Sequence, residues 1–184
     1  MNELALALSL GLASGFFLTL MDRFDEHRII ERHRTATAYL AGIAAAGCMA
    51  WSIELFPIIY PLLFALLFIW IIKGKIDFPS HVFFLFLLTL FMGYHIELLQ
   101  AYWHYILIIT ALNYLSGTVL RRRLGGGGRI MRWYYASYFE KLACYIILAM
   151  ILDSLVFLLY GIGFTVSSLY TKLWLPGTDE QHRC

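Results

Sequence analysis

The stretch RRRLGGGGRIMRWYYASYFEK, from Arg121 to Lys141, decides how the rest of this chain is interpreted. It is strongly charged and rich in glycine, and apolar runs long enough to cross a bilayer flank it on both sides. The hydrocarbon core excludes charged loops, so this stretch must lie at a membrane surface. The sequence therefore predicts a polytopic membrane protein with a basic loop before its last membrane-spanning segment.

The composition supports this class of protein. Of the 184 residues, 61% are hydrophobic and only 14% are charged, and the mean hydropathy is +0.72, outside the usual range for a soluble domain. The formal net charge is only +2, so direct nucleic-acid binding is not expected. The three cysteines have no CxxC spacing, so the sequence predicts neither a disulfide framework nor a metal site.

The apolar runs predict an all-α fold of six transmembrane helices and one interfacial helix. The run from Ser80 to Leu120 holds 41 residues without lysine or arginine, which is about right for two crossings with a turn near the polar residues His95 to His104. Within the basic loop, aromatic residues at helical spacing predict a helix at headgroup level. The expected transmembrane helices are residues 3–21, 35–52, 56–72, 80–96, 102–120 and 142–164, the cytoplasmic links are 22–34, 73–79 and 121–141, and the outer tail is 175–184.

Two stripes of small residues predict where the first helices pack. Gly11 and Gly15 form a GxxxG pair in the first helix, and small residues repeat every fourth position from Ala38 to Ala50 in the second. Such stripes let helix backbones approach closely in a membrane. Either stripe can contact a helix of this chain or a helix of another subunit.

The distribution of basic residues predicts the orientation. When alternate links are assigned to opposite sides, twelve of the fourteen lysines and arginines fall on one side, and Lys172 and Arg183 fall on the other. By the positive-inside rule the basic side is the cytoplasm. The expected location is the inner (plasma) membrane of a bacterium, with both termini outside.

One acidic residue is predicted to lie inside the membrane. Asp153 follows Lys141 by about 18 Å along a continuous helix, which places it near the bilayer midplane. Asn113 and Ser116 on the preceding helix are its candidate partners. A carboxylate at this depth is consistent with a proton or substrate relay, or with an interhelical polar clamp.

The basic loop is the second candidate site. The amide groups of Gly125 to Gly128 could wrap a phosphate, and four arginines could pair with it: Arg121, Arg122, Arg123 and Arg129. The loop lacks the lysine and the serine or threonine of a P-loop, and a flexible loop held near anionic lipid headgroups is the favoured interpretation. Membrane lipids are therefore expected partners.

The sequence does not favour two other chemistries, haem binding and serine hydrolysis. His95 and His104 flank the expected outer turn and could pair as haem ligands, but such residues more often cap a turn at the interface, so no cofactor is expected. Ser116-Gly117 has the local form of a rhomboid-type nucleophile, but no histidine follows it except His182 in the polar tail.

The basic loop with its flanks, Val119 to Arg129 followed by Tyr134 and Tyr135, resembles a loop of integral membrane proteins of conjugative elements. The resemblance covers about twenty residues of the 184. It implies a membrane component of DNA-transfer machinery, which would be an assembly subunit rather than an enzyme.

Three functions follow as expectations. The first is a non-enzymatic subunit of a larger membrane assembly for secretion or transfer, with other membrane proteins as partners. The second is a membrane enzyme that acts on lipid headgroups or prenyl phosphates at the cytoplasmic face through the loop arginines. The third is a small proton-coupled carrier or channel that uses Asp153.

Overall fold

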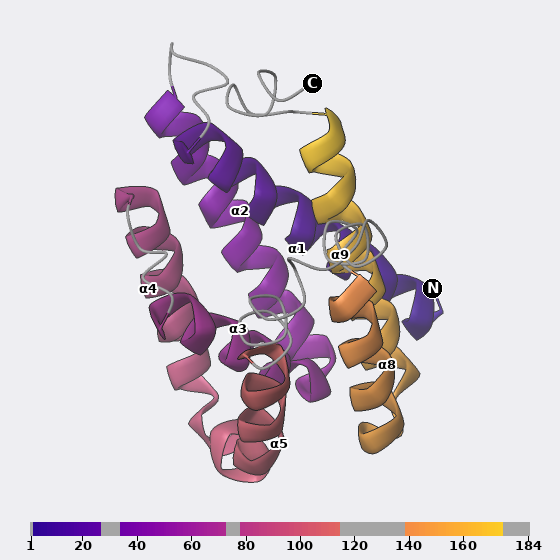
Figure 1. Ribbon diagram of the computed structural model, residues 1–184. Coiled ribbons are helices and arrows are strands. Elements are labelled where there is room, and N and C mark those ends of the chain that lie inside the picture. The colour runs from indigo at the N-terminus through magenta and orange to yellow at the C-terminus, as the bar shows by residue number, and fades with distance from the viewer. Residues whose placement is uncertain (1, 27–33, 73–77, 115–138, 175–184) are drawn as a thin grey trace.

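The structure, a computed structural model, describes residues 2–26, 34–72, 78–114 and 139–174 (Figure 1). The described part of the chain is all-helical, as expected. Its elements are α1 (Glu3–Glu26), α2 (Arg34–Leu55), the short 3-10 helix η1 (Pro57–Ile59), α3 (Tyr60–Ile72), α4 (Pro79–Tyr94), α5 (Ile96–Tyr114), α8 (Phe139–Leu152) and α9 (Leu155–Trp174). The predicted interfacial helix, residues 130–141, lies outside the described residues except for its last three, which belong to α8. The outer tail lies outside the described residues.

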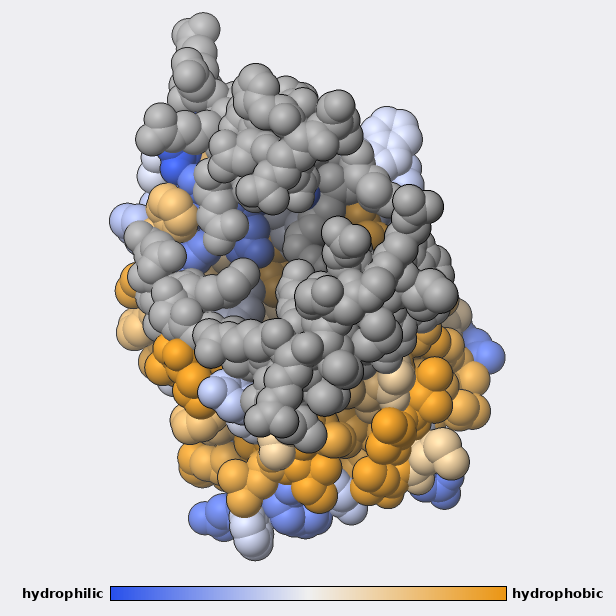
Figure 2. All heavy atoms as spheres, in the orientation of Figure 1, coloured by the Kyte–Doolittle hydropathy of each residue, from blue (hydrophilic) through white to orange (hydrophobic). Residues whose placement is uncertain are grey.

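Two of the described helices, α1 and α2, are each long and apolar enough to cross a membrane. The count rises to three if α4 and α5, a strongly bent pair, form one span. Six crossings are therefore not confirmed. Figure 2 shows hydrophobic residues along the visible lower part of the molecule and hydrophilic residues at its lower end, as expected when an apolar bundle ends in water or headgroups.

Helices α1 and α9 run parallel and pack through glycines. A Cβ on Gly11 would lie 2.2 Å from the carbonyl oxygen of Tyr160, and one on Gly163 would lie 2.5 Å from that of Leu8. Further along both helices, the Ser168 hydroxyl donates to the carbonyl of Gly15 at 3.3 Å. The GxxxG pair of α1 is therefore used inside this chain.

Helix α2 lies between α1 and α4, and its small residues face inward. Gly42 is buried, and a Cβ there would lie 3.0 Å from the Met21 sulfur of α1 and 3.5 Å from the Phe84 Cβ of α4. Ala38 and Ala46 are also buried. The second small-residue stripe is thus used within the chain as well.

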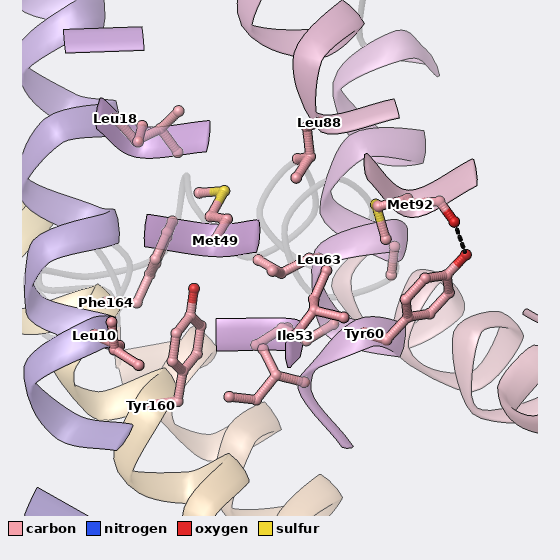
Figure 3. Packing of buried hydrophobic residues seen from close by; sticks show 14 of the residues in the cluster. Leu10, Leu18, Met49, Ile53, Tyr60, Leu63, Leu88, Met92, Tyr160 and Phe164 are labelled. Atoms are coloured by element: carbon pink, nitrogen blue, oxygen red, sulfur yellow. Dashed lines mark hydrogen bonds between the residues drawn. The ribbon is translucent and has the colours of Figure 1, made fainter. Parts of the chain in front are cut away.

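The core extends across the bundle on both sides of α2. Figure 3 shows Leu10 and Leu18 of α1 on one side of Met49 and Ile53, with Leu63 and Leu88 on the other. Tyr60 at the start of α3 is fully buried and donates its hydroxyl proton to the Met92 carbonyl of α4 at 3.2 Å. A buried phenol needs such a partner, and this bond fixes the start of α3 against the end of α4.

The turn expected near His95 to His104 is much shorter than predicted. Helix α4 ends at Tyr94 and α5 begins at Ile96, so the connection is His95 alone. The two helices meet at 105°. Residues 97–101, expected in the turn, form the first turns of α5, and α5 starts six residues before the predicted 102.

The predicted single helix over residues 142–164 is wrong. The chain reverses at Asp153 and Ser154, so α8 and α9 form a hairpin in which a Cβ on Gly161 would lie 2.7 Å from the Tyr145 ring. Asp153 has a positive φ of 48°, and the Ser154 amide donates to the Ala149 carbonyl at 3.0 Å, which is the Schellman arrangement that ends helices.

The same turn starts the next helix. The Ser154 hydroxyl accepts a hydrogen bond from the Phe157 amide at 3.3 Å, the bond that an N-cap serine makes to the third helical residue. Two adjacent polar residues thus end α8 and cap α9. Because of this reversal, α9 ends at the same end of the bundle as α1 (Figure 1).

Candidate functional site

Charged and polar side chains meet where α1 ends and where α2 and α4 begin. We call this group the polar cluster, and its members are Asp22, Arg23, Asp25, Arg34, Ser80 and His81. Helix α1 continues without a break beyond its apolar residues, so the charged residues from Asp22 onward are still helical. Their side chains therefore reach α2 and α4. At the start of α4, Pro79 occupies the first helical turn, where its missing amide proton costs least.

His81 lies at the centre of the polar cluster. Its Nε2 is 3.3 Å from Oδ1 of Asp22 and 3.9 Å from Oδ2 of Asp25. The imidazole is buried and is enclosed by the rings of Trp70 and Phe78, at centroid distances of 5.8 and 5.4 Å. The aromatic walls exclude water, which strengthens the interaction between the ring and the carboxylates.

Asp25 is held from two directions. It is 6% exposed, and Ser80, which is 2% exposed, donates its hydroxyl proton to the carboxylate. Ser80 is in the first turn of α4, where the partial positive charge of the helix N-terminus favours a nearby anion. The buried carboxylate therefore has both a hydrogen-bond donor and a favourable field.

Arg34 joins α1 to α2. Its Nε donates to the Phe24 carbonyl at 2.9 Å, and its terminal nitrogen donates to the carbonyl of Asp25. These are among the last carbonyls of α1, which have no partner within the helix and carry partial negative charge. The guanidinium also lies 5.9 Å from the centre of the Phe78 ring. Arg23, the residue after Asp22 on α1, is buried, with 2% of its surface exposed.

The polar cluster reaches the surface at Asp22. The Asp22 side chain is 22% exposed, whereas that of His81 is 3% exposed. A proton can therefore reach the carboxylate of Asp22 from the surface while the imidazole stays behind it. A histidine paired with a carboxylate is a common proton-transferring unit, since the carboxylate orients the ring and stabilises its charged form. No group of three or more possible metal ligands occurs among the described residues.

The residues predicted from the sequence fall elsewhere. Asp153 is exposed at the α8–α9 turn, which corrects its predicted position inside a continuous helix. Asn113 belongs to α5, but its side chain lies outside the described residues, as do Ser116 and the arginines at positions 121, 122, 123 and 129. The structure therefore does not bring Asp153 and its expected partners into one site.

The two histidines considered as haem ligands have different surroundings. Both ring nitrogens of His95 face carboxylate oxygens, of Glu54 and Glu97. His104 is exposed on α5 and contacts the ring of Tyr105 at a centroid distance of 4.1 Å. His95 is thus engaged on both sides by acidic residues.

The prediction of residues 22–34 as a cytoplasmic link did not include the polar cluster. A local signal was present: Asp22, Arg23 and Asp25 follow the apolar helix with no glycine or proline between them, so the helix can carry them against its neighbours. Their partners Ser80 and His81 are more than fifty residues away, and only the fold brings them together.

No family profile, curated protein or solved structure matches this chain. The polar cluster is therefore the observation from which a function can be inferred.

Proposed function

We propose that this protein is a membrane enzyme that acts on the headgroup of an anionic amphiphile, a phospholipid or a prenyl phosphate, at the cytoplasmic surface. In this proposal Asp22 and His81 form the proton-transferring pair. The single observation that carries it is the contact of the buried His81 imidazole with the partly exposed Asp22 carboxylate, with nitrogen and oxygen 3.3 Å apart, at the end of an apolar helical bundle.

The depth of the polar cluster supports a headgroup substrate. Among the described residues, the charged side chains Arg23 and Asp25 and the imidazole of His81 are buried together at this end of the bundle, whereas the other buried polar side chains are serines and threonines. Ionisable groups within a membrane protein usually mark a functional site. A site at the end of the bundle fits a reacting group at the membrane surface, while a carrier would need such groups near its middle.

The charges of the polar cluster support an anionic substrate. Arg34 binds the end of α1 beside the proton-transferring pair, and Arg23 is the residue after Asp22 on the same helix. Guanidinium groups bind phosphate through paired hydrogen bonds. The loop arginines at positions 121–123 and 129 stay candidates for the same role, since the chain between α5 and α8 carries them.

The orientation is part of the proposal. Helices α1 and α9 end at the upper end of the bundle in Figure 1, where α2 and α4 begin, and Trp70 near the end of α3 contacts His81. Helix α8 begins about half-way down the bundle and runs away from that end. Lys172, near the end of α9, then falls on the same side as the basic links. All fourteen lysines and arginines can face one way, which the positive-inside rule assigns to the cytoplasm. The C-terminus would then be cytoplasmic, not outside as first predicted.

The two other functions have less support. The small-residue stripes that favoured an assembly subunit pack α1 and α2 against helices of the same chain. The carrier hypothesis depended on a buried Asp153, which is exposed at a turn. The subunit role and the resemblance to conjugative-element proteins stay untested predictions.

The test uses the full-length protein in vesicles made from ³²P-labelled total lipid of its native membrane. Thin-layer chromatography and mass spectrometry follow each phosphorylated lipid with time. We expect one species to change its headgroup, and His81→Gln and Asp22→Asn to reduce that rate by a factor of about 100 or more, as for loss of a general acid–base group. His104→Gln, which changes an exposed histidine outside the polar cluster, is the matched control and should keep the rate.

Two other results would each contradict part of this proposal. If no lipid changes and the purified protein instead retains other membrane proteins in fixed stoichiometry by native mass spectrometry, the subunit function is correct. If a lipid changes at the same rate in wild type and in both variants, the enzyme function holds but the polar cluster is not its site.

A further inference from the structure

A second histidine occupies a structural joint at the end of the bundle opposite the polar cluster. His95 is the single residue between α4 and α5, whose axes differ in direction by 105°. Its backbone, with φ −101° and ψ 41°, ends α4, and its carbonyl accepts a hydrogen bond from the Leu98 amide at 3.0 Å. The side chain is 15% exposed, so the ring is largely enclosed at the bend itself.

Two carboxylates from different helices face the two nitrogens of this ring. Nε2 of His95 is 3.2 Å from Oε1 of Glu54, in the last turn of α2, and Nδ1 is 3.4 Å from Oε1 of Glu97, in the first turn of α5. A neutral imidazole has one N–H group and one acceptor nitrogen, so it can donate to only one of them. Both contacts are favourable only when the ring is protonated.

We propose that His95 is a pH-sensitive clamp that holds the α4–α5 bend against the end of α2 when its ring is protonated. Loss of the proton leaves one ring nitrogen with a lone pair facing a carboxylate oxygen. That contact becomes repulsive, and the joint between α2 and α5 loosens. The clamp is independent of the proposed enzymatic function.

The surrounding groups are consistent with this assignment. From η1 and α3, Tyr60 binds the Met92 carbonyl and holds the last turn of α4 independently of pH in the neutral range. From α4, the rings of Phe91 and Tyr94 contact the imidazole at 4.9 and 5.0 Å. The lysine and arginine side chains that the structure describes are Arg23 and Arg34, both in the polar cluster. In the described part of the chain, His95 is thus the cation available to the two glutamates.

The sign of the effect follows from the ring's charge. The clamp is closed when the ring carries a proton, and it opens when the ring loses that proton as the pH rises. Because the glutamate side chains are 52% and 65% exposed, the ion pairs are screened by water. Exposed pairs of this kind change a population ratio by roughly two- to fivefold.

The experiment measures the distance between α2 and α5 as a function of pH. Spin labels are placed at Trp51→Cys and Gln100→Cys, both exposed positions, in full-length protein in lipid nanodiscs with the three native cysteines replaced by alanine. Double electron–electron resonance is recorded from pH 5 to pH 8.5. We expect a narrow distribution at pH 5 and a second, longer population that grows roughly two- to fivefold as the pH rises.

Two variants decide the outcome. His95→Gln keeps a polar side chain of similar size but cannot change charge, so its distribution should not depend on pH; Glu54→Gln with Glu97→Gln should abolish the dependence in the same way. His104→Gln, on an exposed face of α5, should behave like wild type. A wild-type distribution that is constant from pH 5 to 8.5, or a pH dependence that persists in His95→Gln, would overturn the proposal.

Discussion

Gly11 of α1 and Tyr160 of α9 approach so closely that a Cβ on Gly11 would lie 2.2 Å from the Tyr160 carbonyl oxygen. The obstacle is backbone, which cannot move aside as a flexible side chain can. The contact therefore depends on glycine, and it fixes the parallel packing of the first and last described helices.

Gly11→Ala should destabilise the protein strongly. Overpacking of a tight contact typically costs about 1–3 kcal/mol, and here it exceeds the gain of about 1 kcal/mol that alanine normally brings to a helix. Gly47→Ala is the matched control, because Gly47 lies in α2 and a Cβ there would meet no atom within 4 Å. Thermal unfolding in a mild detergent should show a lower midpoint for Gly11→Ala and an equal or higher one for Gly47→Ala. Equal midpoints would contradict the α1–α9 contact.

A second prediction concerns the hydrogen bond that joins the same two helices. The Tyr160 hydroxyl donates to Ser14 Oγ at 3.1 Å, and both residues are fully buried. Tyr160→Phe and Ser14→Ala should each cost about 1 kcal/mol or more. Because each single change leaves the other group without its partner, the double variant should be more stable than the sum of the two losses predicts. Additive losses in the free energy of unfolding would mean that the two hydroxyl groups do not interact.

The sequence was sufficient for the parts of the fold that depend on long apolar runs. The predicted helices 3–21, 35–52 and 56–72 correspond to α1, α2 and the unit of η1 and α3, within a few residues at most ends. Glycine and proline, or a cluster of charges, separate these runs, and hydropathy alone detects such boundaries. The charged end of α1 extends five residues beyond the predicted boundary, because a helix does not need to stop where the apolar run stops.

The α8–α9 hairpin could not be predicted in the same way. Asp153 and Ser154 are the only polar residues between Tyr145 and Tyr160, and two polar residues in a run of this length are also compatible with one continuous helix. A hairpin differs from a continuous helix here in its backbone, through the positive φ of Asp153 and the N-cap made by Ser154. The packing of Tyr145 against Gly161 stabilises this turn. The polar cluster was missed for a related reason, since the partners of Asp25 and His81 lie on helices distant in sequence.

The α8–α9 hairpin allows a test of whether Asp153 acts as a turn residue or as an intramembrane carboxylate. Asp153→Asn should be tolerated, since asparagine adopts a positive φ about as readily as aspartate. Asp153→Val should lower stability by about 1–2 kcal/mol, because a β-branched residue is strained at a φ of 48°. The measurement is the unfolding midpoint of both variants in the same detergent. A large loss of stability or of any proton-coupled activity in Asp153→Asn would instead support a buried, charged role.

The last prediction concerns the side of the membrane on which the chain ends. Helix α9 runs parallel to α1, so if the N-terminus is outside, the C-terminus should be cytoplasmic. Cys184 is the last residue and can report this after Cys48 and Cys144 are replaced by alanine. In intact cells a membrane-impermeant maleimide should label Cys184 only after the membrane is permeabilised. An Asn2→Cys, Cys184→Ala variant serves as the opposite control and should react without permeabilisation. Labelling of both Cys184 and the Asn2→Cys variant in intact cells would instead restore the topology with both termini outside, and it would contradict the parallel packing of α1 and α9.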